Sequence, residues 1–307
     1  MLGSDLPVRR LGFGAMRLTG PGTWSEPSNP LAAQGVLRRA VELSVSFIDT
    51  ADSYGPEVSE RLIAEALYPY PDGLVIATKG GQRRGGPYQW RADCRPASLR
   101  KACEASLRRL RLERIDLYQL HTVDPGVPLE ESVGALTELQ AEGKVRHIGL
   151  CNVNGEQLAR ARSIASIVSV QNCYSLADRT WEDVLEACER DRLVFIPLMP
   201  LARGALAGRR SGLGRIAATH GATPAQVALA WLLQRFRVTL PIPGTSSLAH
   251  LEENVAARDL RLTEQELAAL DRYRPPGLET FRRELRHKVR PLAVPVVTSI
   301  LSLRRRG

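Results

Sequence analysis

The sequence predicts an α/β fold of the (β/α)8 TIM-barrel type. Short apolar runs alternate with helical stretches eight times over about 250 residues, the count and size of such a barrel. Five successive runs each end at a polar residue, as expected where strand ends converge on one mouth. We also expect an N-terminal hairpin before the first strand, and an extra C-terminal helix and a tail after the last unit.

Each expected strand is an apolar run bounded by residues that favour turns. The eight strands are expected at residues 11–16, 45–49, 74–78, 115–120, 145–150, 167–170, 193–198 and 238–242. Two long connections, residues 80–95 and 200–214, are rich in glycine or proline and are expected to be loops.

The expected helices carry start and stop signals. Pro96 stands in a first turn, Gly143 follows a helix end, and Thr223 and Thr263 begin capping boxes. The helices are expected at residues 31–43, 57–67, 96–110, 129–142, 156–162, 180–190, 223–235, from 247 to 257, and 263–272.

A doubly wound open sheet is the alternative fold. That fold usually carries G-x-G-x-x-G after its first strand when it binds a dinucleotide. Here Gly12 and Gly14 are followed by Arg17 where the third glycine would stand, which favours the barrel. We expect residues 1–274 to form a single barrel domain and residues 275–307 to form a separate tail.

The net charge of +9 is concentrated at the end of the chain. Residues 281–307 hold eight basic residues and one acidic residue, so this segment carries +7 of the total. The charge therefore indicates a basic tail and no nucleic-acid-binding body. An apolar run at 292–303 lies between basic clusters; we favour packing or disorder for it over contact with an anionic membrane.

No signal peptide and no apolar run of spanning length is found, so we expect a cytoplasmic protein. The number of cysteines is five, and no CxxC occurs. We therefore expect reduced thiols, with no disulfide framework and no metal site.

The chemistry is expected at the polar ends of strands two to six, which are Asp49, Lys79, His121, Asn152 and Gln171. Any one of them could be an ordinary polar residue satisfied at a strand end. Five in succession are hard to explain by packing, which would favour valine or isoleucine.

A buried Asp49 and Lys79 can pair and compensate each other's desolvation. Tyr54, five residues beyond Asp49, would then lie beside an ammonium, which is expected to lower its pKa from the usual ~10. His121 can hydrogen-bond a carbonyl oxygen or share the proton transfer. Such a site donates a proton to an oxygen. The amides of Asn152 and Gln171 can pair with a carboxamide, although a capping or core role fits them equally well.

Several segments together are highly specific: 11–16, 47–55, 77–80, 115–121, 144–152, 170–172, 200–204 and 242–247 with Glu253 and Asn254. On these, the chain resembles an aldo-keto reductase over nearly all of residues 6–273. The resemblance implies reduction of aldehydes and ketones by a nicotinamide cofactor on a (β/α)8 barrel. It also implies a catalytic tetrad of Asp49, Tyr54, Lys79 and His121.

The resemblance further implies a set of cofactor-binding residues. These are Met16, Asp49, Asn152, Gln171, Leu198, Leu201, Arg203, Gly204, Gly244, Thr245, His250, Glu253 and Asn254. Many family members have an aromatic ring where this chain has Leu198, and Lys or Arg where it has Gly244 and His250. The resemblance implies NADP(H) in preference to NAD(H), and the missing Lys and Arg at the expected 2′-phosphate site weaken that preference.

The substrate is expected to be a small carbonyl compound that meets Tyr54 and His121. Trp24, Tyr88 and Trp90 are candidate substrate contacts, although each could simply cover the barrel rim. Two other functions stay open: a cofactor-binding regulatory subunit without turnover, and a lyase that uses Lys79 to form a Schiff base. The sequence leaves the substrate, the direction of reaction and the oligomeric state open.

Overall fold

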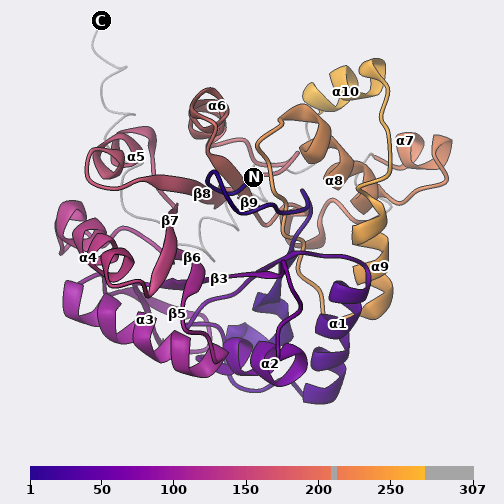
Figure 1. The fold of residues 1–307 in the computed structure, drawn as a ribbon. Coiled ribbons are helices and arrows are strands. Elements are labelled where there is room, and N and C mark those ends of the chain that lie inside the picture. The colour runs from indigo at the N-terminus through magenta and orange to yellow at the C-terminus, as the bar shows by residue number, and fades with distance from the viewer. Residues whose placement is uncertain (209–212, 274–307) are drawn as a thin grey trace, which may run out of the picture.

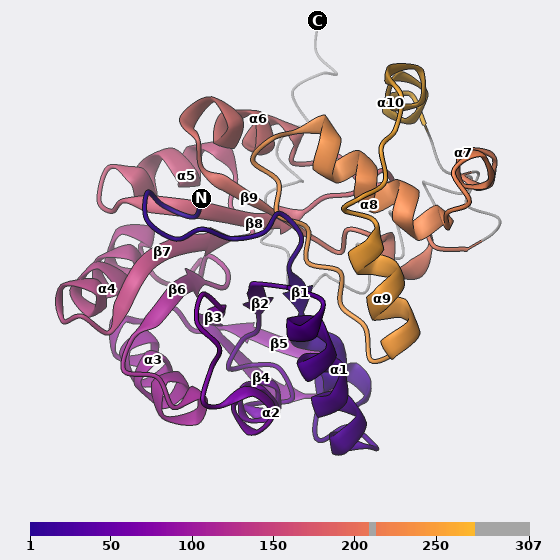
Figure 2. The same cartoon turned by 45° about the vertical axis from the view of Figure 1, so that its right-hand side comes forward.

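A ring of parallel strands lies inside a ring of helices (Figures 1 and 2). The computed structural model describes residues 1–208 and 213–273. Seven parallel strands form one sheet in the order β1-β2-β3-β6-β7-β8-β9. Their bounds are Phe13–Gly14, Phe47–Asp49, Val75–Gly80, Ile115–Leu120, Val145–Cys151, Ile167–Cys173 and Val194–Leu198. The predicted barrel is confirmed, and it positions the strand ends on one face.

The prediction of an eighth strand at residues 238–242 is wrong. This segment pairs with β9 only at one bridge, where Phe195 N donates to Val238 O at 3.0 Å and Leu240 N donates to Phe195 O at 2.8 Å. On its other side, the Gly12 N–H donates to Pro241 O at 2.9 Å, which connects the segment to the start of the chain. Pro241 and Pro243 have no N–H to donate, which removes two donors that a regular ladder could use here. The segment closes the ring without forming a regular strand.

All nine expected helices are present within about two residues, the usual uncertainty of helix ends. Their bounds are α1 Pro30–Glu42, α2 Val58–Leu67, α3 Pro96–Leu110, α4 Leu129–Ala141, α5 Gly155–Arg162, α6 Glu182–Asp191, α8 Pro224–Arg235, α9 Leu248–Ala256 and α10 Glu264–Asp271. The capping boxes expected at Thr223 and Thr263 are formed. A short helix, α7 (Gly214–Thr219), was not expected.

The connection at residues 80–95 is a β-hairpin instead of a loop. Strand β4 (Gln82–Gly86) pairs antiparallel with β5 (Gln89–Ala92). Gly86 and Tyr88 both have a positive φ at the turn. The glycines there made the segment look unstructured in sequence, yet they permit the tight turn that joins the two strands.

The N-terminus closes the bottom of the barrel. Leu2 and Leu6 form one antiparallel bridge, at the place where we expected an N-terminal hairpin. Leu2 is fully buried in a cluster that includes Val75 and Val194, the first residues of β3 and β9. Figure 2 shows this segment, in indigo, crossing in front of the strands. It covers the N-terminal strand ends, so the opposite face carries the site.

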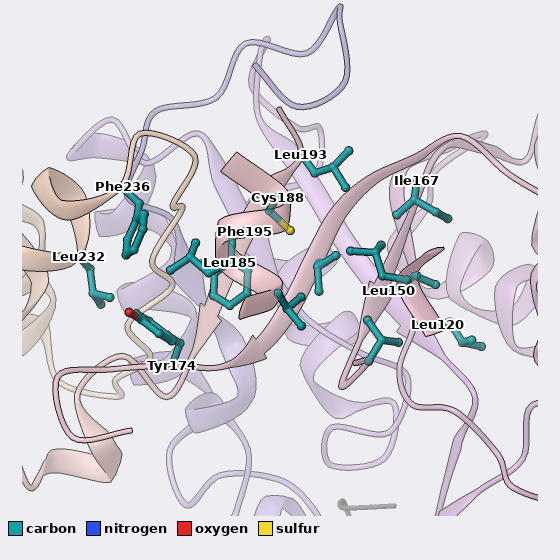
Figure 3. Packing of buried hydrophobic residues seen from close by; sticks show 14 of the residues in the cluster. Leu120, Leu150, Ile167, Tyr174, Leu185, Cys188, Leu193, Phe195, Leu232 and Phe236 are labelled. Carbon is teal, nitrogen blue, oxygen red and sulfur yellow. The ribbon is translucent and has the colours of Figure 1, made fainter. Parts of the chain in front are cut away.

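The largest apolar cluster lies between the later strands and their helices (Figure 3). Tyr174 stacks on Trp231 with ring centroids 6.1 Å apart and meets Phe195 and Phe236 edge-on. Large side chains that are fully buried each contribute about 1.5–3 kcal/mol to stability. This packing fixes β8 and β9, and with them the site residues at their ends.

Within the described residues, no helix has the length and apolarity that crossing a membrane requires. The tail at 275–307, including the apolar run at 292–303, lies outside the described residues.

Candidate active site

The centre of the site is a buried ion pair. The Lys79 ammonium donates to Asp49 Oδ1 at 2.6 Å, to Thr50 O at 2.7 Å and to the Tyr54 hydroxyl at 3.3 Å. Lys79 is completely buried. Burial alone would lower the pKa of Lys79, but the Asp49 carboxylate beside it raises the pKa above its usual value. The ammonium is therefore kept charged next to the phenol.

Asp49 is held from its other side by two amides. Gln119 Nε2 donates to Asp49 Oδ2 at 3.1 Å, and Gln171 Nε2 donates to the same oxygen at 2.8 Å. All three side chains are buried. A buried carboxylate needs such donors to offset the loss of its water.

The prediction that the pKa of Tyr54 is lowered is wrong. Burial outweighs the neighbouring Lys79 ammonium and raises the pKa of Tyr54 to about 12. The hydroxyl is almost completely removed from water, and that cost was not visible in sequence. The phenol therefore keeps its proton at neutral pH.

His121 lies beside this group with its ring edge-on to Tyr54, at a centroid distance of 5.7 Å. Its Nδ1 is 3.3 Å from the Ser53 hydroxyl. Burial, and then the charges of Lys79 and Arg84, lower the pKa of His121 far below its usual value. The imidazole is therefore neutral and can act as a hydrogen-bond donor.

The two strand-end amides are already engaged within the protein. Asn152 has a positive φ of 56°, and its Nδ2 donates to His121 O at 3.0 Å. Gln171 donates one N–H of its amide to Asp49, and its amide oxygen can accept a ligand's N–H. The structure thus ties both amides to the same site as the four proton-transfer candidates.

A second region lies where the segment after residue 242 meets the start of β1. A side chain at Gly244 would place its Cβ only 2.6 Å from Gly14 O, so the two backbones touch. Thr245 Oγ1 accepts from Ser247 N, and Ser247 caps the N-terminus of α9. This end carries partial positive charge, and His250 lies in the first turn.

Two cations lie near this region. Burial lowers the pKa of Arg203, and the charge of Arg17 lowers it further, so the two guanidinium groups repel each other. Arg17 also lies against Gly244, since its Cγ is 3.5 Å from the position a Cβ would take there. Within residues 1–208 and 213–273, neither arginine has an acidic partner. Two unpaired cations beside a helix N-terminus and a glycine cradle fit a polyanionic ligand.

The remaining predicted cofactor residues lie on or next to β9, β1 and α9. Leu198 ends β9, and Leu201, Arg203 and Gly204 follow it in a turn with positive φ values at the last two. Met16 lies in the short helix after β1. Asn254 is buried, whereas the Glu253 side chain accepts from Thr223 at the start of α8, so its carboxylate is engaged there.

The three candidate substrate aromatics are not equivalent. Trp90 lies 6.3 Å from the Tyr54 ring and 6.1 Å from the His121 ring, centroid to centroid. Trp24 is connected to Trp90 through Arg84, whose guanidinium lies over both rings. Tyr88 is 69% exposed, so the structure places it at the rim.

A further carboxyl group lies close behind the site. Asp52 Oδ1 is buried and has no hydrogen-bond partner among the described residues. Burial, and then the nearby Glu60, raise the pKa of Asp52 to about 8. Within the described ranges, no three His, Cys, Asp or Glu side chains gather as a metal site would require, and the five cysteines are free thiols.

The sequence analysis did not identify four residues of the site, which are Arg17, Ser53, Arg84 and Gln119. Gln119 could have been found, because it lies two residues before His121 and strand alternation puts both on one face. Ser53 lies beside Tyr54 in the same loop, but no pattern marked it. Arg17 and Arg84 act through contacts with distant loops, which no local pattern shows.

Comparison with known proteins agrees with this geometry. The sequence model of the aldo/keto reductase family matches residues 10–274. An uncharacterized oxidoreductase of Schizosaccharomyces pombe is 48% identical over 267 residues, covering 87% of each chain. Pyridoxine 4-dehydrogenase of Escherichia coli is 48% identical over 270 residues, covering 86% of this chain and 94% of that protein.

Solved structures agree as well. The crystal structure of an aldo-keto reductase from Klebsiella pneumoniae in complex with NADPH is similar with a TM-score of 0.74. It is 31% identical, and the match covers 88% of this chain and 92% of that chain.

 A second crystal structure from that organism, an aldo/keto reductase in complex with NADP and acetate, is 30% identical with a TM-score of 0.73. The match covers 88% of this chain and 93% of that chain.

Proposed function

The chain belongs to the aldo/keto reductase family, and from this premise we propose that it reduces an aldehyde or ketone to the alcohol, reversibly, with NADP(H) as cofactor. Tyr54 is the general acid in this proposal, assisted by Lys79, Asp49 and His121. The observation that carries it is the buried contact of Lys79 with both Asp49 and the Tyr54 hydroxyl. An acid that stays protonated beside a fixed positive charge suits proton donation to a carbonyl oxygen.

The proposed cofactor supplies a hydride to the carbonyl carbon when it is bound. Asn152 and Gln171, with the apolar Met16 and Leu198, would hold its nicotinamide end. The phosphate groups would lie against Leu201, Arg203, Gly204, Gly244, Thr245 and His250, and the adenosine end against Glu253 and Asn254. Arg17, which lies against Gly244, and the nearby Arg203 support this arrangement, and neither has an acidic partner among the described residues. The Klebsiella pneumoniae relative, which was crystallised with NADPH, supports NADP(H) over NAD(H).

The protein's own groups then handle the proton. Tyr54 gives its proton to the carbonyl oxygen as that oxygen gains negative charge. The phenolate left behind is stabilised by the Lys79 ammonium, whose Nζ is 3.3 Å from the Tyr54 oxygen. Neutral His121 donates a hydrogen bond to the same substrate oxygen and helps to orient it.

We further propose a small ring-bearing aldehyde of the pyridoxal type as substrate. The relative named pyridoxine 4-dehydrogenase is 48% identical over most of both chains. Trp90, beside Tyr54 and His121, offers an aromatic surface against which a flat ring can pack.

The Schiff-base alternative is disfavoured by the environment of Lys79. A lysine that attacks a carbonyl carbon must be neutral, and such lysines usually have a lowered pKa. Here Asp49 raises the pKa of Lys79, and the ammonium is bonded to three oxygens.

The test combines binding and turnover. NADPH and NADH are titrated by fluorescence, and then pyridoxal and a panel of aldehydes and ketones are followed at the nicotinamide absorbance. Tyr54→Phe is expected to keep NADPH affinity and to lose about 10²–10⁴-fold in turnover. Tyr68→Phe is the matched control, because it removes the hydroxyl of a half-exposed tyrosine outside the site.

Survival of turnover in Tyr54→Phe would show that another group is the acid. Tight NADPH binding with no oxidation of NADPH by any compound would instead favour the regulatory-subunit function.

A further inference from the structure

Arg84 lies in β4, within the β-hairpin, and every N–H donor of its guanidinium group is used in a hydrogen bond. Arginine has five N–H groups. They donate to the carbonyl oxygens of Gly22, Thr23, Ser53, Gly86 and Gln89 at 2.5–3.2 Å. No N–H remains for a substrate anion, so Arg84 does not act as a hydrogen-bonding substrate ligand.

Those five carbonyl groups belong to three separate loops above the strand ends. We call residues 19–29, 50–57 and 81–95 the three mouth loops. The other backbone bonds between them are few, such as Gly55 N to Thr23 O at 3.2 Å and Tyr88 N to Gly22 O at 3.3 Å. Arg84 is therefore the side chain that joins all three loops at one point.

The same guanidinium also holds the aromatic side chains of the mouth. Its central carbon lies 3.7 Å from the Trp90 ring centroid and 5.6 Å from that of Trp24. Trp90 in turn contacts Tyr54 and His121 edge-on. A planar fork that stacks on a ring while filling in-plane hydrogen bonds is specific to arginine, and lysine cannot reproduce it.

We propose that Arg84 is a positioning residue that ties the three mouth loops together and holds Trp90 beside Tyr54 and His121, so that ring-bearing carbonyl compounds are preferred over small aliphatic ones. The preference rests on the proposed reductase function, whereas the positioning of Trp90 does not. Arg84 acts through Trp90 and touches no reacting atom.

The experiment compares Arg84→Ala and Arg84→Lys with Arg83→Ala in the full chain. Arg83 is the matched control, since it is the adjacent arginine of the same strand but is 63% exposed and pairs with Asp93 of its own segment instead of with the other two mouth loops. NADPH-dependent reduction of pyridoxal and of propanal is measured, together with NADPH affinity and thermal unfolding.

In Arg84→Ala, kcat/KM for pyridoxal is expected to fall by about ten- to a hundredfold, chiefly through a higher KM, because a displaced Trp90 side chain no longer aligns the pyridoxal ring. For propanal, which is too small to depend on packing against Trp90, kcat/KM is expected to change much less. Arg84→Lys should behave like Arg84→Ala. Added guanidinium ion should partly restore the KM for pyridoxal in Arg84→Ala, and Arg83→Ala should match the parent.

Equal losses for both substrates, or an Arg84→Lys variant that matches the parent, would overturn the proposal. If Arg84→Ala does not fold, Arg84→Lys carries the same comparison.

A second measurement is independent of turnover. The Trp90 emission, obtained as the difference between each protein and its Trp90→Phe version, is quenched with acrylamide. Quenching of this emission should increase in Arg84→Lys and stay at the parent level in Arg83→Ala; no increase would overturn the positioning role. A parent that reduces neither compound would refute the proposed function alone, since the quenching still decides the role of Arg84.

Discussion

Removing the charge of Lys79 should destabilise the protein strongly. In Lys79→Met, the Asp49 carboxylate would stay buried and lose a partner at 2.6 Å, keeping only the amides of Gln119 and Gln171. Breaking a buried pair in this way costs about 3–5 kcal/mol, mainly because a charge is left uncompensated. Asp49→Asn should cost a similar amount, since it leaves the ammonium unpaired.

The double variant separates this effect from general disruption. With both charges removed, no buried charge is left alone, so the loss should be smaller than the sum of the two single losses. We expect a coupling of about 2 kcal/mol or more between the two positions, near the upper end for contacting residues. Urea unfolding, followed by circular dichroism, measures all four proteins of the cycle.

Lys144→Met is the control for the loss of an ion pair. Lys144 is 2.7 Å from Glu104, nearly the same separation, but both side chains are about one-third exposed. Solvent screens such pairs, so its loss should matter far less. The reasoning is refuted if Lys79→Met costs no more than Lys144→Met, or if the cycle shows no coupling.

Four further outcomes are expected. Because the pKa of Tyr54 is raised to about 12, the phenol stays protonated at neutral pH. Between roughly pH 6 and 9, ionisation of Tyr54 should therefore cause no fall in kcat/KM for reduction. A fall in that range that depends on Tyr54 would contradict this. The pKa of Asp52 in the folded state, about 8, exceeds its value in the unfolded state, so the folded state binds the extra proton and stability falls as pH rises from about 4 to 8. In denaturant titrations above pH 8, Asp52→Asn should be more stable than the parent by an amount on the order of a few kcal/mol. This difference should vanish below about pH 4. Gly244→Ala would place its Cβ 2.6 Å from Gly14 O, so fluorescence titration should show weaker NADPH binding, with a loss of stability of about 1–3 kcal/mol; unchanged affinity would separate this contact from the cofactor site. Leu2→Ala should lower the free energy of unfolding by about 2 kcal/mol or more, because Leu2 is fully buried, and no change in urea unfolding would show that the bottom of the barrel tolerates its loss.

The helices could be predicted well because their signals are local. The Thr223 and Thr263 capping boxes lie within four residues of the chain and form as expected. The segment at 238–242 shows the limit of such signals. Its apolar residues read as a strand, but strand pairing also depends on partners far away in the sequence, and proline leaves gaps in its hydrogen bonding.

The centre of the site could be predicted because a parallel barrel gathers its strand ends by construction. Asp49, Lys79 and His121 needed only their position after an apolar run. The direction of the Tyr54 pKa could not be predicted, since it depends on how completely the hydroxyl is buried and not on which charge lies nearest. Arg84 had no signal either, because its five acceptors are backbone carbonyl groups, which any residue supplies.

The way the ring closes also has a consequence for how the chain folds. The bond from Gly12 N to Pro241 O joins residues that are 229 positions apart, so it cannot form until almost the whole barrel has left the ribosome. Contacts over such long separations are slow to form. Until then, β1 has a free edge that another chain could pair with. We therefore expect ring closure to be a late step of folding and the stage at which the protein is most prone to aggregate.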